Sequence, residues 1–186
     1  SHQHCCSIPT IFDIVCKIAK EYNVKHIRIP NEKFFIHGSL ISNCNRSYIL
    51  NLIKWLILKI FSIFNMKTAN KYGLFYPDSF IGVLYTGKMN TEICIQAINN
   101  VKQSALVEVL LHPSKLIGEF QETYLTSQLR NYCLSSNRLK ELDTLISPKL
   151  KSYLIKNKLI TTNLSESYEK NISIFNTSEQ KSKKVF

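Results

Sequence analysis

The spacing of apolar residues predicts a helix over residues 8–22. Apolar side chains recur there at Ile8, Ile11, Phe12, Val15, Ile18, Ala19 and Tyr22. This spacing places them along one face of a helix. Asn23 can end that helix, and residues 24–29 then read as a short strand. Pro30 stops the strand because proline cannot donate to a strand ladder.

Further along the chain, expected helices and strands alternate. Residues 47–65 form a densely apolar expected helix, and strands are expected at residues 80–85, 105–111 and 159–162. The second of these strands is a continuous apolar run broken only by Glu108, which is typical of a strand buried on both faces.

Three more helices are expected from their starting residues. Asn90 or Thr91 can cap a helix that runs to about Val101, and Ser136 or Asn137 can cap one that runs toward Leu145. Pro148 suits the first turn of a helix that ends near residue 157.

This alternation, without a hairpin signal, predicts a parallel α/β fold, either a barrel or an open sheet. One domain is expected over residues 1–162, followed by a polar tail over residues 163–186 that is expected to be disordered. The chain opens on Ser-His-Gln-His without Met, so we expect it to be a portion of a longer domain. It has no glycine-rich phosphate loop, and a nucleotide-binding fold therefore has no support.

Charge changes this picture only slightly. The chain has 24 Lys and Arg against 13 Asp and Glu, a net charge of +11, but the lysines are scattered and only the tail holds a dense run. No nucleic-acid-binding motif accompanies them, so no nucleic-acid partner is expected. Lys54 and Lys59 interrupt the apolar helix at residues 47–65. A helix packed on a core is the favoured interpretation, membrane-surface association is the alternative, and no membrane span is expected.

The six cysteines are irregularly spaced and include no Cys-x-x-Cys pair. A zinc ribbon or a redox motif is therefore not indicated. Reduced, mostly buried thiols in a cytoplasmic protein are the simpler interpretation.

The first candidate site is the pair His2 and His4. On a strand, residues two apart point to the same face, so the two imidazoles could share a metal ion. The helix over residues 8–22 follows directly, which would put both histidines at the carboxyl end of a strand, where α/β barrels build their active sites. A surface histidine pair without a metal stays open at this point.

The second candidate is His112, which follows the expected strand over residues 105–111 and precedes Pro113. An imidazole at a strand end suits proton transfer, because its ordinary pKa lies near neutrality. Alternatively, it only bonds a loop carbonyl. Arg28 lies near the end of another strand and could orient a substrate group or pair with Glu32. His26 and His37 are interpreted as incidental.

Several motifs together resemble the YdjC-like family of carbohydrate deacetylases, which includes chitooligosaccharide deacetylases and hopanoid-associated HpnK proteins. The opening Ser-His-Gln-His-Cys-Cys-Ser-Ile-Pro is similar to the family's Asp-Ser-His-x-His-x-His-x-x-Pro stretch, and Ile27-Arg28-Ile29-Pro30 is similar to its Arg-x-Pro segment. Glu108 to Pro113 resembles its Glu-x-x-x-His-Pro-Gly motif, and the helix with Arg138 and Glu141 resembles its Arg-x-x-Glu-Leu helix.

The resemblance implies a deformed TIM-barrel-like fold, of which this chain would be the C-terminal part. It also implies metal-dependent removal of an N-acetyl group from an amino sugar or chitooligosaccharide. By position in the motifs, His2 would bind the divalent metal, Mg²⁺ or Zn²⁺, and His4 would be a second metal or substrate contact. Arg28 would contact substrate and His112 would give a proton to the leaving amine.

The chain also departs from the family pattern. Cys6 replaces a third histidine, Ser114 replaces the glycine after His-Pro, and an Asp-Asp-Phe-Gly motif is absent. We therefore expect this portion alone to be inactive. The alternatives are an inactive remnant and a basic module that binds a membrane surface or nucleic acid. A homodimer stays open as well.

Overall fold

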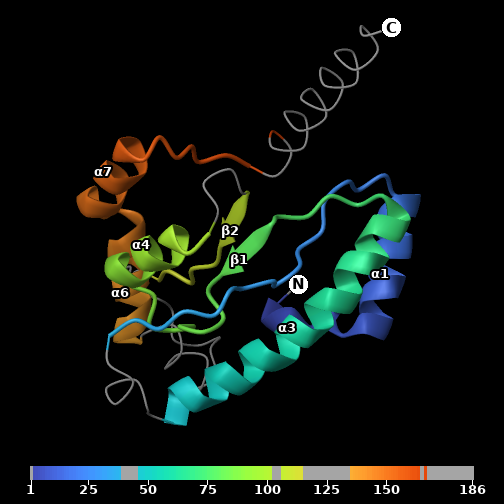
Figure 1. The fold of residues 1–186 in the computed structure, drawn as a ribbon, viewed down its shortest axis with the longest axis horizontal. Helices are drawn as coiled ribbons and strands as arrows, with labels where there is room; N and C mark the ends of the chain where they lie inside the picture. The colour runs from blue at the N-terminus through green and yellow to red at the C-terminus, as the bar shows by residue number, and fades with distance from the viewer. Residues whose placement is uncertain (1, 39–45, 102–105, 115–134, 164–165, 167–186) are drawn as a thin grey trace, which may run out of the picture. The chain divides into compact units, whose positions relative to one another are not determined.

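The computed structural model describes residues 2–38, 46–101, 106–114, 135–163 and 166 (Figure 1). In chain order its elements are the 3-10 helix η1 (His2–Ser7), α1 (Pro9–Glu21), α3 (Arg46–Tyr72), β1 (Ser79–Ile81), α4 (Thr91–Asn99), β2 (Val107–Val109), α6 (Ser136–Leu145) and α7 (Pro148–Lys156). The chain divides into two compact units, and the division passes through α3. The first unit comprises Ser1–Ile29, Phe61–Pro77 and Ile160–Phe186, and the second comprises Pro30–Ile60 and Asp78–Leu159.

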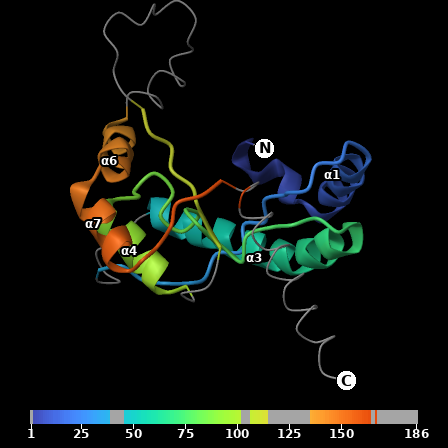
Figure 2. The same ribbon diagram turned by 90° about the horizontal axis from the view of Figure 1, so that it is seen from above.

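In the first unit, α1 lies alongside the second half of α3 (Figure 2). The buried face of α1 carries Phe12, Cys16 and Ala19, at the helical spacing that the sequence predicts. They pack with Ile29, Ala69 and Leu74 in one hydrophobic cluster. The Asn65 amide, fully buried on α3, donates to the carbonyl of Ser7 over 2.8 Å.

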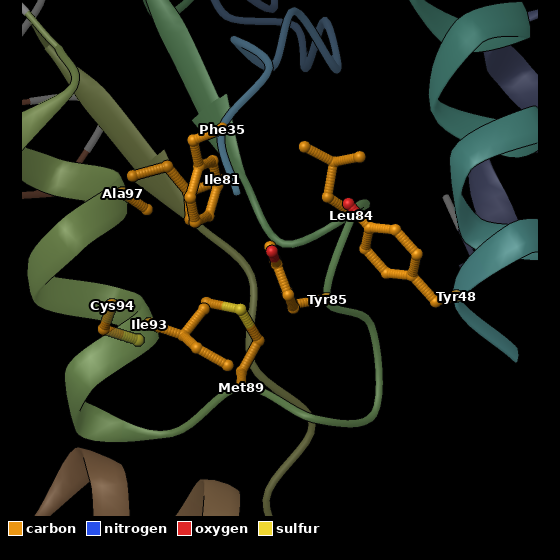
Figure 3. Close-up of a cluster of buried hydrophobic side chains, with 9 residues drawn as sticks. All are labelled: Phe35, Tyr48, Ile81, Leu84, Tyr85, Met89, Ile93, Cys94 and Ala97. Atoms are coloured by element: carbon orange, nitrogen blue, oxygen red, sulfur yellow. The ribbon is translucent and has the colours of Figure 1, made fainter. Parts of the chain in front are cut away.

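The second unit is built on β1 and β2, which pair in parallel with Phe80 opposite Glu108. The α4 helix begins where Asn90 Oδ1 accepts the Ile93 amide at 2.9 Å, and α7 begins where Ser147 Oγ accepts the Leu150 amide. Figure 3 shows the core of this unit, where side chains from α4, from the chain around β1 and from α3 meet. The nine buried residues of this cluster are Phe35, Tyr48, Ile81, Leu84, Tyr85, Met89, Ile93, Cys94 and Ala97.

The parallel pairing is compatible with the predicted α/β class, whereas the barrel stays a prediction. The predicted helices over residues 8–22 and 148–157 are confirmed as α1 and α7, and the one that runs toward Leu145 is confirmed as α6. Its predicted cap at Ser136 or Asn137 is wrong, because Ser135 holds the cap position and makes no capping bond. The predicted strands are shorter than expected or missing. The strand predicted over residues 80–85 ends at Ile81, because Gly82 to Leu84 donate their amides to a side chain instead.

Three other strand predictions are wrong in part or entirely. The strand predicted over residues 105–111 is not buried on both faces, because Val109 in β2 is 37% exposed. Residues 24–29 contribute a single parallel bridge, between His26 and Phe75. Residues 159–162 form no strand at all. The predicted tail over residues 163–186 lies outside the described residues, except for Asn163 and Glu166.

The apolar helix is longer than predicted and packs on a core with one face only. By length and composition, Tyr48–Tyr72 could cross a membrane, and 17% of its most apolar window is buried. The thiol prediction is confirmed for Cys16 and Cys94, which are free and buried, but Cys5 is exposed.

Candidate active site

The backbone of His112 is held on both sides by α6. Its amide donates to Glu141 Oε2, and its carbonyl accepts Arg138 Nη1 at 3.1 Å. Arg138 and Glu141 are three residues apart, so they share one face of the helix. The segment itself follows β2, whose pairing continues for one more bond, from the Leu110 amide to the Ile81 carbonyl at 2.8 Å.

The same carboxylate lies close to the imidazole. Glu141 Oε2 is 3.7 Å from His112 Nδ1, and the glutamate side chain is completely buried whereas the histidine side chain is 27% exposed. Burial raises the pKa of Glu141, while the Arg138 charge and the amides of Gly87 and Met89 act in the opposite direction. A carboxylate beside one ring nitrogen favours the protonated ring. The arrangement therefore places a buried carboxyl group beside an imidazole that solvent reaches.

A second buried carboxylate, Glu32, lies in the same unit. Its oxygens accept the amides of Gly82, Val83 and Leu84 at 2.8, 3.0 and 2.8 Å, and its carbonyl accepts Trp55 Nε1 at 3.1 Å. Burial raises its pKa, and the three amide bonds oppose that rise. Because each carboxylate oxygen is bound by backbone, this side chain fixes the turn after β1 rather than presenting a reactive group.

His4 and Arg28 belong to the first unit, whereas His112 belongs to the second. The prediction that His2 and His4 share one face of a strand is wrong, because His2–Ser7 is a 3-10 helix. His4 is buried, with a backbone φ of 59°, and Arg28 is half-buried beside buried Ile29. The side chain of His2 lies outside the described part of the molecule. Among the side chains that are described, no group of three or more His, Cys, Asp or Glu could hold a metal ion.

The two histidines that the sequence left without a role differ from His112 in their surroundings. His37 Nδ1 lies 2.6 Å from Gln96 Oε1, and its amide donates to the Tyr85 hydroxyl at 2.7 Å. The His26 ring stands edge-on to Phe75, with 5.9 Å between ring centroids. These contacts, with an amide oxygen, a hydroxyl and an aromatic ring, fit structural roles for both histidines.

Sequence reasoning gave Glu141 no catalytic role, although a signal was present. Arg138 and Glu141 lie in an Arg-x-x-Glu spacing on a predicted helix, and charged residues are rarely fully buried unless they are paired. Here Arg138 is 6% exposed and Glu141 is 0% exposed. Their only visible sequence signal was this spacing, because the partner, His112, lies 29 residues away.

Comparison with known proteins agrees with this arrangement of motifs. The family model described as YdjC-like protein matches residues 1–156, which include every candidate residue named above. No curated protein and no solved structure matches the chain. The family suggests a carbohydrate-deacetylase type of function. The chain belongs to the YdjC-like protein family.

Proposed function

We propose that this protein is an N-deacetylase that releases acetate from an N-acetylated amino sugar or chitooligosaccharide. The observation that supports this best is the contact between His112 and Glu141, in the segment that resembles the family's His-Pro motif. The partly exposed ring and the buried carboxyl group beside it suit acid catalysis of amide cleavage.

The proton transfer follows from the chemistry of the amide bond. Water adds to the acetyl carbonyl, and the C–N bond breaks when the amine nitrogen receives a proton, which gives acetate and the free amino sugar. Glu141 lies beside Nδ1, so it stabilises the doubly protonated ring of His112. The proton on Nε2, across the ring, then goes to the leaving amine. Arg138 holds the His112 backbone through its bond to the carbonyl, and its positive charge opposes the rise in the pKa of Glu141.

A divalent metal, Mg²⁺ or Zn²⁺, is the proposed cofactor, and it would polarise the acetyl carbonyl. This proposal rests on the family resemblance at His2, with His4 as a second ligand or substrate contact and Arg28 as a substrate contact. The described residues do not fit a complete metal site by themselves. We also propose a cytoplasmic protein that binds no nucleic acid and does not span a membrane. A homodimer and inactivity of this portion alone stay proposals as well.

The test is acetate release from N-acetylated chitooligosaccharides by the protein as its gene encodes it, after chelation and again with added Mg²⁺ or Zn²⁺. His112→Asn should lower the rate by about 100-fold or more while the circular dichroism stays unchanged. His37→Asn is the matched control, since the His37 ring lies against the amide oxygen of Gln96, away from the segment with the His-Pro motif. If the parent protein releases no acetate, the alternative of an inactive remnant is favoured. If both variants lose the same share of the rate, His112 has no specific role in the reaction.

A further inference from the structure

The first half of α3 presents a continuous apolar surface to solvent. Six large aliphatic side chains form it, and each is between 46% and 57% exposed. They are Ile49, Leu50, Ile53, Leu56, Ile57 and Ile60, here called the apolar stripe. Their spacing of three, four and seven residues places them along one side of the helix. Single exposed apolar residues are ordinary, but a contiguous row of this length marks an interaction surface.

The other side of the same helix is already occupied. Leu58 is buried with Phe80 and Val83, and Trp55 packs against Phe34 with 5.3 Å between ring centroids. Farther along α3 the buried residues include Ser62 and Asn65, both 0% exposed. The helix therefore turns polar residues inward at that end while Ile63 and Phe64 face outward. Packing among the described residues does not explain the stripe.

The charge of α3 indicates which kind of surface the stripe fits. The helix contains five basic residues, Arg46, Lys54, Lys59, Lys67 and Lys71, and no acidic residue. The whole chain carries a net charge of +11. Lys54 lies within the stripe's length and is half-buried, so its stem can lie along apolar material while its ammonium group reaches the edge of that material. Lys59 also lies within this length, and its ammonium group donates to Asn31 Oδ1 at 2.7 Å. Anionic lipid offers both an apolar layer and the opposite charge.

We propose that α3 docks this protein in the plane of an anionic membrane surface, with the apolar stripe in the boundary between headgroups and acyl chains. A membrane-crossing orientation is disfavoured, because it would expose Trp55, Leu58 and their partners to lipid and break the bond from Asn65 to Ser7. A second copy on the stripe is disfavoured as well. Two-fold pairing would bring helices without any acidic residue face to face, and like charges oppose that contact.

The experiment is co-sedimentation of the whole chain with vesicles of phosphatidylcholine alone or mixed with phosphatidylserine. We expect retention on the mixed vesicles and weaker retention on the neutral ones, with a decrease as salt rises. The double variant Ile53→Gln with Ile57→Gln should bind the mixed vesicles about tenfold less or weaker still. Ile155→Gln is the matched control, because Ile155 is 67% exposed on α7, outside the stripe. It should bind like the parent.

Two further measurements keep the result interpretable. Trp55 is the single tryptophan, so its emission verifies that each variant keeps the packing of α3. Lys54→Gln leaves the stripe intact and should weaken binding to the mixed vesicles by about fivefold. Absence of binding to the mixed vesicles, or equal binding by the stripe variant and the parent, would overturn the proposal. So would a concentration-dependent dimer that the stripe variant loses, which would assign the surface to a second copy.

Discussion

Glu32 and Glu141 are two carboxylates buried in the same unit, and their partners differ. Both carboxylate oxygens of Glu32 accept backbone amides that follow β1, and its charged neighbour is Lys59, which opposes the rise in the Glu32 pKa and donates to Asn31 Oδ1. Glu141 gives one oxygen to the amide of His112 and lies beside that residue's imidazole, which solvent reaches. Burial and a raised pKa are common to both. Both side chains are buried, so what distinguishes them is the group each one contacts: Glu32 contacts backbone amides that hold a turn, and Glu141 contacts an imidazole that suits catalysis.

The largest effect is expected at Gly82, in the turn that Glu32 holds. Gly82 has a φ of 128°, and an added Cβ would lie 2.7 Å from the Leu110 carbonyl oxygen. Gly82→Ala combines backbone strain with a clash against backbone, so we expect a loss of about 3 kcal/mol or more in the free energy of unfolding. Urea unfolding followed by Trp55 emission measures it.

Gly87→Ala is the matched control on the Glu141 side. Gly87 also has a positive φ, 76°, but an added Cβ would meet nothing within 4 Å. Only the conformational cost stays, about 1 kcal/mol. Equal losses in the two variants would show that the close approach of Gly82 to Leu110 does not matter for the turn.

Glu32→Gln comes next in size. A glutamine has one acceptor oxygen, so its NH₂ group would face at least one of the three amides that now donate to the carboxylate. We expect a loss of about 2–4 kcal/mol in the free energy of unfolding, measured by urea titration. Glu92→Gln makes the same substitution on the surface, where Glu92 pairs with Lys149, and should leave the unfolding midpoint unchanged. A small effect of Glu32→Gln would mean that the turn does not depend on this charge.

These two carboxylates also explain how far the sequence could be interpreted. The start of α4 was predictable because its signal is local: Asn90 caps the helix three residues before the amide that it accepts. The end of β1 was not, because the amides of Gly82, Val83 and Leu84 bond to Glu32, about 50 residues earlier. Strand length was therefore decided by a contact that no local pattern records.

The candidate site divides in the same way. His112 could be found because an apolar run, a histidine and a proline follow one another in the sequence. Its contact with Glu141 spans 29 residues and needed the structure. The strand predicted at His2 and His4 failed because alternate residues imply one face only if the segment is extended, and His2–Ser7 forms a 3-10 helix.

Glu141→Gln should affect stability less than Glu32→Gln. The glutamine oxygen can still accept the His112 amide, and Glu141 Oε1 accepts no hydrogen bond from the described residues, so we expect a loss of about 1–2 kcal/mol in the free energy of unfolding. Acetate release should fall by about tenfold or more, because the protonated imidazole loses the carboxylate at 3.7 Å. Glu32→Gln should therefore lower the free energy of unfolding more than Glu141→Gln does, whereas Glu141→Gln should lower the rate of acetate release more. Unchanged acetate release in Glu141→Gln would place this carboxylate with Glu32, as a structural group.

The smallest effect concerns the thiol of Cys94, which reports the charge on Glu141. Burial, and then the charge of Glu141, raise the pKa of Cys94 to about 11, whereas burial and Asp13 raise the pKa of Cys16 to about 11. A raised thiol pKa keeps the unreactive neutral form until strongly alkaline pH, so labelling of both residues should rise only there. Glu141→Gln removes the negative charge that adds to the effect of burial, so the pKa of Cys94 should fall. The rise in Cys94 labelling should then begin at lower pH.

Site-resolved mass spectrometry of the native protein, treated with a thiol reagent across a pH series, can separate this effect from loosened packing. Loosening would speed Cys94 labelling at every pH, whereas loss of the charge moves the midpoint of the profile. The Cys16 profile should be the same in parent and variant, since Asp13 is its charged neighbour. An unmoved Cys94 midpoint would mean that Glu141 is already neutral in the native protein. It could not then stabilise a protonated His112, and the distinction between the two buried carboxylates would lose its electrostatic basis.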